Sequence, residues 1–213
     1  MRKINLILAL VLSSFVFVSC QKEFSSEEGN GGGTGTGGGS GTGSGSIIGT
    51  WKLLELEART NSTVTTGTGA GQEKMVTVSH YITKNNTGTM NFDGSKVTQT
   101  NISYSVDTTA KAYYYVGGAL IDQMEAPFQF SLPSYSSTGT YRQIGSDSLY
   151  FDGGSGFMSG TAVQGAPGGM KFRIEGDKLF MTTTASTTQS QVVQGFNVTT
   201  TNTVQAEARL QRQ

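Results

Sequence analysis

The chain has 213 residues, of which 15 are basic and 15 acidic, so its formal net charge at pH 7 is zero. Charged residues make up only 14%, so no strongly basic surface is available for nucleic acid, and we expect no nucleic-acid partner. The single cysteine and single histidine cannot supply the usual ligand set of a zinc site. We therefore expect no metal and no other cofactor.

The N-terminus has the order of an export signal. A basic pair, Arg2-Lys3, precedes an apolar run over residues 6–18, and the small residue Ser19 comes just before Cys20. The run is shorter than the roughly 20 apolar residues that span a bilayer. The segment resembles the lipobox of bacterial lipoproteins, with Phe17 and Ser19 at positions where that family prefers other residues. The resemblance implies a signal peptide over 1–19 and lipidation of Cys20. The alternative is an ordinary secretory signal cleaved nearby, with Cys20 incidental.

The residues after Cys20 predict a tether. Gln21-Lys22-Glu23 resembles the surface-export signal of some Gram-negative lipoproteins, and residues 29–46 are almost entirely Gly, Thr and Ser. As a glycine-rich coil, the 26 residues from Gln21 to Ser46 span roughly 30 Å, so 20–46 is expected to be a lipidated flexible linker. We expect a protein anchored by lipid in the outer membrane of the cell, either exposed at the surface or facing the periplasm.

Residues 47–213 predict a single all-β domain, since threonine is abundant and apolar residues recur with a period of two. Strands are expected at 50–58, 75–83, 89–92, 97–106, 113–116, 128–132, 139–144, 148–152, 170–175, 179–183, 192–200 and 203–211. Residues 61–74 and 153–169 are expected to be long loops, and 119–125 the only helical turn. In the second strand, Val76, Val78, His80 and Ile82 share the face expected to point inward.

Alternating apolar and polar residues are typical of antiparallel strands that are buried on one side. A closed or stacked arrangement of about eight to ten strands would cover the edges that such segments would otherwise expose. We therefore predict an up-and-down β-barrel, with a β-sandwich or jelly roll as the alternative.

The first strand opens with Gly49-Thr50-Trp51, which contains the only tryptophan. This motif resembles the Gly-x-Trp start of lipocalins, and more closely the lipocalin-like domains of small Gram-negative lipoproteins. In that family the tryptophan closes the barrel floor and an arginine near the last strand stacks over it. The resemblance implies this role for Arg212, which is expected on the same face of the last strand as the inward Ala208 and Leu210. Arg209 is the alternative.

The expected function is binding of a small apolar or amphipathic ligand without catalysis, because no paired acid and base and no nucleophile motif is present. The candidate ligand-contacting residues are aromatic, sulfur-containing or histidine side chains on inward faces: His80, Met90, Phe92, Tyr104, Phe128, Phe130 and Phe172. For His80, the alternative is a structural hydrogen bond to a hydroxyl. The alternative function is a surface structural or glycan-binding module with Tyr114 as the contact.

Overall fold

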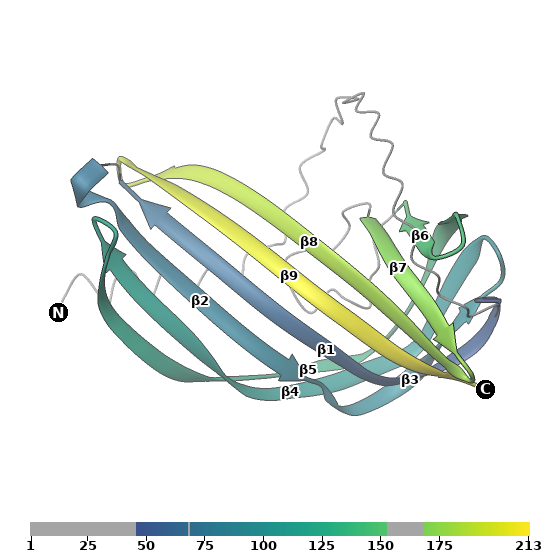
Figure 1. The fold of residues 1–213 in the computed structure, drawn as a ribbon. Coiled ribbons are helices and arrows are strands. Elements are labelled where there is room, and N and C mark those ends of the chain that lie inside the picture. Colours follow the sequence, from purple (N-terminus) through teal and green to yellow (C-terminus); the bar gives the residue numbers. More distant parts are fainter. Residues whose placement is uncertain (1–45, 68, 153–167) are drawn as a thin grey trace. The chain divides into compact units, whose positions relative to one another are not determined.

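The computed structural model describes residues 46–67, 69–152 and 168–213, and these form an antiparallel all-β domain (Figure 1). The predicted signal peptide, Cys20, the tether through residue 45 and most of the expected loop at 153–169 lie outside the described residues. The strands are β1 Gly49–Thr66, β2 Glu73–Ile82, β3 Lys84–Phe92, β4 Lys96–Val116, β5 Ala119–Ile144, β6 Ser148–Phe151, β7 Gly168–Glu175, β8 Lys178–Val193 and β9 Phe196–Arg212, with a short 3-10 turn, η1, at Gly69–Gly71. The described part of the chain contains no helix that could cross a membrane.

The nine strands follow one another around a sheet that nearly closes into a ring. Strand β1 pairs first with β3 and then with β2, which are separated only by Thr83. From β4 to β9 each strand pairs with the next, and β9 returns to β1 over a register from Trp51↔Arg212 to Thr66↔Val198. The prediction of a barrel-like antiparallel all-β fold is confirmed, and the sandwich alternative is not adopted.

The ring is complete at one end only. Strands β6 and β7 are short and bridge β5 to β8 near the C-terminus (Figure 1). Beyond them, β5 from residue 119 to about 140 and β8 from residue 183 to 193 have no second partner strand among the described residues. We call the end with β6 and β7 the closed end and the opposite end the open end.

The hydrophobic core fills the closed end. Its largest fully buried side chains come from β1, β3, β4, β6, β8 and β9: Trp51, Phe92, Phe151, Met90, Ile102, Leu149, Leu179, Met181 and Leu210. Tyr141 links two of them, with ring centroids 5.3 Å from Phe92 and 6.1 Å from Phe151. Each large apolar side chain buried in this way stabilises the fold by about 1.5–3 kcal/mol, so most of the stabilisation is concentrated at this end.

Several strands are longer than predicted. Residues 119–125 were expected to be a helical turn but begin β5, where Ala119 pairs with Val116 of β4. Most of the expected loop at 61–74 is strand, because β1 continues to Thr66 and β2 starts at Glu73. Threonine, serine and asparagine occupy both faces of the β1 extension, and residues 119–125 mix apolar and polar side chains without strict alternation, so no apolar alternation marks either segment as a strand.

The prediction of which face of the second strand points inward was wrong. The buried residues of β2 are Met75, Ser79 and Tyr81, and Tyr81 pairs with the buried Ala58 of β1. Val76, Val78, His80 and Ile82 therefore point outward. The error arose because the outer face of β2 is the more apolar one, while hydroxyls occupy part of its inner face.

Candidate ligand-binding face and barrel floor

The closed end is sealed by the motif at the start of β1. Trp51 is fully buried, and its Nε1–H donates a hydrogen bond of 2.7 Å to the carbonyl of Ile47. The Arg212 guanidinium lies over the Trp51 ring, 4.2 Å from its centroid, and also donates to the carbonyls of Ile48 and Ser46. Gly49 has a φ of +131°, and a Cβ there would come within 3.1 Å of Arg212 Nη1. A Cβ at position 49 would therefore crowd the guanidinium that covers the tryptophan, and the positive φ itself favours glycine there.

Arg209, the alternative arginine, lies elsewhere. It points to the outer face and forms ion pairs with Glu55, Glu57 and Glu207. The structure therefore places Arg212, and not Arg209, against Trp51.

Four of the predicted ligand-contacting residues belong to the packed core. Met90 and Phe92 are 0% and 1% exposed, and Tyr104 and Phe172 are also buried. A ligand would reach them only by displacing core packing, because β6 and β7 contribute the large side chains that fill this end. The accessible inner surface of the domain starts beyond them.

Phe128 and Phe130 of β5 mark the boundary between the core and this accessible surface. Both are partly buried, and their ring centroids are 5.6 Å apart. Tyr81 packs against both rings at 6.0 and 6.3 Å, and Tyr104 lies 6.1 Å from Phe130. Burial raises the pKa of the Tyr81 phenol, so this aromatic cluster stays uncharged at neutral pH.

Beyond this cluster, six strands continue the same inner face towards the open end. We call this surface the distal inner face; its position follows from the registers of β1, β2, β4, β5, β8 and β9. One side, the apolar wall, consists of Ala110, Ala112 and Tyr114 of β4 and Met124, Phe128 and Phe130 of β5. The other side, the polar wall, carries hydroxyl and amide side chains from Thr60 and Ser62 of β1, Thr187 of β8, and Thr200 and Asn202 of β9, with Val64, Ala185, Val198 and Val204 interspersed on the same face.

The two walls are joined through β2. Thr77 pairs with Ser62 on the polar side and with Ala112 on the apolar side. The Thr60 and Ser79 hydroxyls are 2.7 Å apart and hydrogen-bond each other. Asn202 lies opposite both Ser62 and Thr187, so hydroxyl and amide groups adjoin across three neighbouring strands. The polar residues of this surface were missed from the sequence because threonine and serine also dominate the outer faces.

Tyr114 belongs to the distal inner face, close to the open end. It pairs with Met75 of β2 on one side and with Asp122 of β5 on the other. Desolvation raises the pKa of its phenol, and the nearby Glu73 carboxylate raises that pKa further. Its neighbours Tyr113 and Tyr115 point to the outer face, where the Lys74 ammonium lies 4.5 Å from the centre of the Tyr115 ring.

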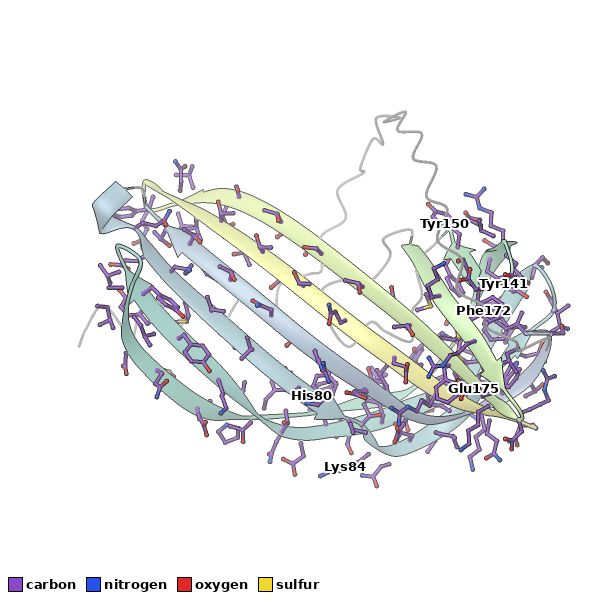
Figure 2. All side chains as sticks on the ribbon, viewed as in Figure 1. His80, Lys84, Tyr141, Tyr150, Phe172 and Glu175 are labelled. Atoms are coloured by element: carbon purple, nitrogen blue, oxygen red, sulfur yellow. The ribbon has the colours of Figure 1, made fainter. Side chains whose placement is uncertain are left out.

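His80 does not contribute to this inner surface, and the prediction that it points inward is wrong (Figure 2). Its side chain is 53% exposed on the outer face, and its Nε2 lies 2.8 Å from Glu57 Oε1. The hydrogen-bond partner is thus a carboxylate, and not the hydroxyl expected in the structural alternative. Within the described residues, no group of three or more His, Cys, Asp or Glu side chains could hold a metal ion.

No family model, no curated protein and no solved structure matches this chain. The fold itself defines the broad class, an antiparallel all-β protein with a barrel-like sheet. Function must therefore be argued from the distal inner face and the sequence before the domain.

Proposed function

We propose that this chain is a lipid-anchored, lipocalin-like protein of the outer membrane that binds a small amphipathic ligand and catalyses no reaction. The observation that carries the proposal is the division of the distal inner face into an apolar wall and a polar wall. Ligand sites are usually apolar surfaces with a few placed polar groups, which is the arrangement here.

The two walls favour a particular ligand chemistry. Phe128, Met124 and Ala112 offer apolar contact for an acyl chain or a ring system. Thr60, Thr187 and Asn202 offer hydroxyl and amide groups that can donate and accept hydrogen bonds but carry no charge. The strand registers place Glu73 and Asp122 on the inner face, next to the apolar wall. Their negative charges disfavour an anionic head group. We therefore expect a neutral amphiphile, such as an ester or amide of a fatty acid.

The location is supported by the sequence alone. The basic pair, apolar run and Cys20 support export and lipidation. A single acyl chain binds membranes only marginally, so stable anchoring needs at least two chains. Mass spectrometry of the membrane-extracted protein would test this, since the N-terminal peptide should start at Cys20 and carry acyl chains.

Ligand binding can be tested with uncharged probes and a matched pair of variants. Nile red, a neutral polarity-sensitive dye, should bind the full chain carrying Cys20→Ser, and monolaurin should displace it more effectively than laurate. Ala112→Trp would fill the distal inner face, and we expect about tenfold weaker dye binding or more. Lys111→Trp changes the adjacent residue, which is exposed, and should leave binding unchanged. An absence of dye uptake, or equal effects of the two substitutions, would contradict the proposal.

A glycan-binding surface module is the second candidate. The observation that favours it is that Tyr114 and the polar wall share the inner face of the sheet, since hydroxyl and amide groups can bind sugar hydroxyls while the ring stacks on the sugar. Neutral oligosaccharides belong in the same competition assay. Displacement of Nile red by an oligosaccharide but not by monolaurin, with loss of sugar binding in Tyr114→Ala, would favour this candidate over the first.

A further inference from the structure

Three turns are joined at the open end of the sheet. They connect β1 to β2, β4 to β5, and β8 to β9 (Figure 1). Gly67 N–H donates to the carbonyl of Asn197 at 3.4 Å, and Gly117 N–H donates to the carbonyl of Gln72 at 2.9 Å. These two backbone hydrogen bonds connect the three turns. We call residues 67, 69–72, 117–121 and 192–197 together the rim.

The rim is apolar and uncharged. It carries Leu120, Ile121, Val192 and Phe196, which are 52%, 59%, 69% and 60% exposed. These are four of the seven large apolar side chains that are strongly exposed in the described part of the chain. No Asp, Glu, Lys or Arg occurs in the three rim segments. Exposed apolar side chains collected at one place indicate an interaction surface.

The turns at the closed end have the opposite character. Each of them contains an aspartate: Asp93 between β3 and β4, Asp147 between β5 and β6, and Asp177 between β7 and β8. The Asp93 carboxylate accepts hydrogen bonds from the N–H groups of Lys96 and Ser95, and these lower its pKa. Charged turns of this kind remain hydrated. The absence of charge from the rim is therefore a property of one end of the domain.

We propose that the rim enters the boundary between head groups and acyl chains of a lipid bilayer, an inference that rests on the proposed membrane location and amphiphile binding. Just behind the rim, Tyr113 and Tyr115 lie on the outer face of β4. Tyrosine is enriched at this depth of membranes because its ring is apolar and its hydroxyl is polar. The nearest charged groups, Glu73, Lys74 and Asp122, directly follow the rim in the strands and would remain at the head-group level.

A bilayer fits the spacing of the rim better than a second copy of the chain. The β4–β5 and β8–β9 turns are separated by β1 and β2, which places β4 and β9 three strand spacings apart, about 14 Å. The apolar side chains of the rim lie on two tips separated by the glycine-rich η1 turn, whereas a stable dimer buries a continuous patch of roughly 800 Å² per partner. A fluid surface accommodates both tips at once. Because the rim carries no basic residue, binding should require neither anionic lipid nor low salt.

The proposed anchor at Cys20 permits this contact. Roughly 26 residues separate Cys20 from Ile47, and a fully extended chain of that length reaches about 85 Å. The 17 residues of β9 span about 56 Å along the strand. The anchor therefore does not prevent the end of the domain opposite Ile47 from reaching the same membrane.

The depth of the rim can be measured with a spin label in dioleoylphosphatidylcholine vesicles. The full chain carrying Cys20→Ser and Val192→Cys would be labelled, with Ser146→Cys in a closed-end turn as the matched label. Ile121→Asp/Phe196→Asp would then be introduced into the Val192→Cys protein. The control is Ile48→Asp/Ile144→Asp, which changes apolar residues that are 52% and 53% exposed but lie at the closed end. The apolar N-terminal segment is common to all variants.

We expect the label at 192 to be accessible to oxygen and shielded from a water-soluble nickel complex, while the label at 146 remains in water. The rim double variant should lower the immersed fraction on the order of tenfold, and the closed-end variant should not change it. A label at 192 that remains aqueous, or equal effects of the two double variants, would overturn the proposal. A dimer in vesicle-free solution that dissociates in the rim variant would also overturn it, in favour of a second copy. Nile red binding to the same proteins reports on the distal inner face, so failure of the ligand proposal would be seen separately.

Discussion

Arg212 combines three interactions in one guanidinium group at the barrel floor. It covers the Trp51 ring, and it donates to the carbonyls of Ile48 and Ser46, which precede β1. The last residue of β9 thereby fixes the segment that enters β1. Since Gly49 leaves room for the guanidinium, the Gly-x-Trp motif and Arg212 form one structural unit.

Loss of Arg212 should destabilise the domain measurably. Arg212 is an exposed residue, so its cation–π contact with the buried Trp51 ring contributes about 0.5–1 kcal/mol, while a hydrogen bond from a charged donor contributes about 1.5–3 kcal/mol. We expect Arg212→Met to lower the free energy of unfolding by about 2–3 kcal/mol, and Arg212→Lys to lower it by less. Urea denaturation followed by fluorescence would measure this, because Trp51 is the only tryptophan.

The matched control is Arg142→Met. Arg142 lies 4.6 Å from the Tyr150 ring centroid, but its side chain is 65% exposed, so its removal should cost no more than about 0.5 kcal/mol. Equal losses for Arg142 and Arg212 would show that the floor contact is not special.

Single residues show where sequence-based reasoning succeeded and failed. The inward orientation of Ala206, Ala208 and Leu210 could be predicted because these apolar residues of β9 alternate with charged or polar ones. The orientation of His80 was not, because the outer face of β2 carries valines and isoleucine while Ser79 occupies the inner face. Only the pairing of Tyr81 with Ala58 determines which face is buried, and pairing is not visible in a single strand.

At the scale of elements, a charged cluster connects β1, β7 and β9 on the outer face. Glu57 and Glu207 are direct cross-strand partners, and like charges in that position are destabilising. Arg209 pairs with both carboxylates and with Glu55, and Arg173 of β7 reaches Glu207 at 3.0 Å. The arginines therefore convert a repulsive pair into an attractive network.

This network should make stability depend on pH. Burial alone would raise the pKa of the Glu207 carboxyl, but the hydrogen bonds from Arg173 and Arg209 outweigh it and the pKa is lowered. A pKa that is lower in the folded state stabilises the fold above the unfolded value, about 4.3, and this stabilisation is lost as pH falls through the folded pKa. We expect Arg209→Gln to lower the free energy of unfolding by roughly 1 kcal/mol at pH 7, with a smaller difference from wild type at pH 3.

Urea denaturation at both pH values would measure this difference. Arg59→Gln is the control, since Arg59 also contacts Glu57 but is 65% exposed, and it should have little effect at either pH. A loss in Arg209→Gln that is unchanged at pH 3 would argue against a charge network and for loss of packing by the arginine stem.

The two strand edges that have no second partner among the described residues also differ from each other. Strand β5 contains Pro127 and Pro133, which lack an N–H and are typical of edge strands. The facing segment of β8, residues 183–193, has neither proline nor charge.

The barrel-like class was predictable from alternation in 170–175 and 203–211, but the lengths of β4, β5 and β8 were not. The extensions of β4 and β8 carry threonine on both faces and the start of β5 lacks strict alternation, so pairing with neighbours, and not local pattern, makes them strands.

At the scale of the whole domain, the two ends differ in burial and in charge. The closed end contains the core, the Trp51 floor and hydrated aspartate turns. The open end contains the distal inner face and the uncharged rim, with fewer fully buried side chains. If the rim meets the bilayer as proposed, the distal inner face opens towards the phase in which a neutral amphiphile is most soluble.

This division predicts uneven local stability, measurable by amide hydrogen exchange and mass spectrometry. Exchange protection follows the local free energy of opening, which increases with buried apolar contact. Peptides covering residues 51–58 and 206–211 should therefore exchange slowest, and those covering 119–128 and 185–203 fastest.

Two variants test this division. Leu179→Ala removes a fully buried side chain, lowers the free energy of unfolding by about 2–5 kcal/mol and should accelerate exchange throughout the domain. Thr187→Ala, on the polar wall, should affect only peptides near the open end. Uniform protection along β8 and β9 would instead show that the strands open as one unit, and ligand entry would then require opening of the core itself.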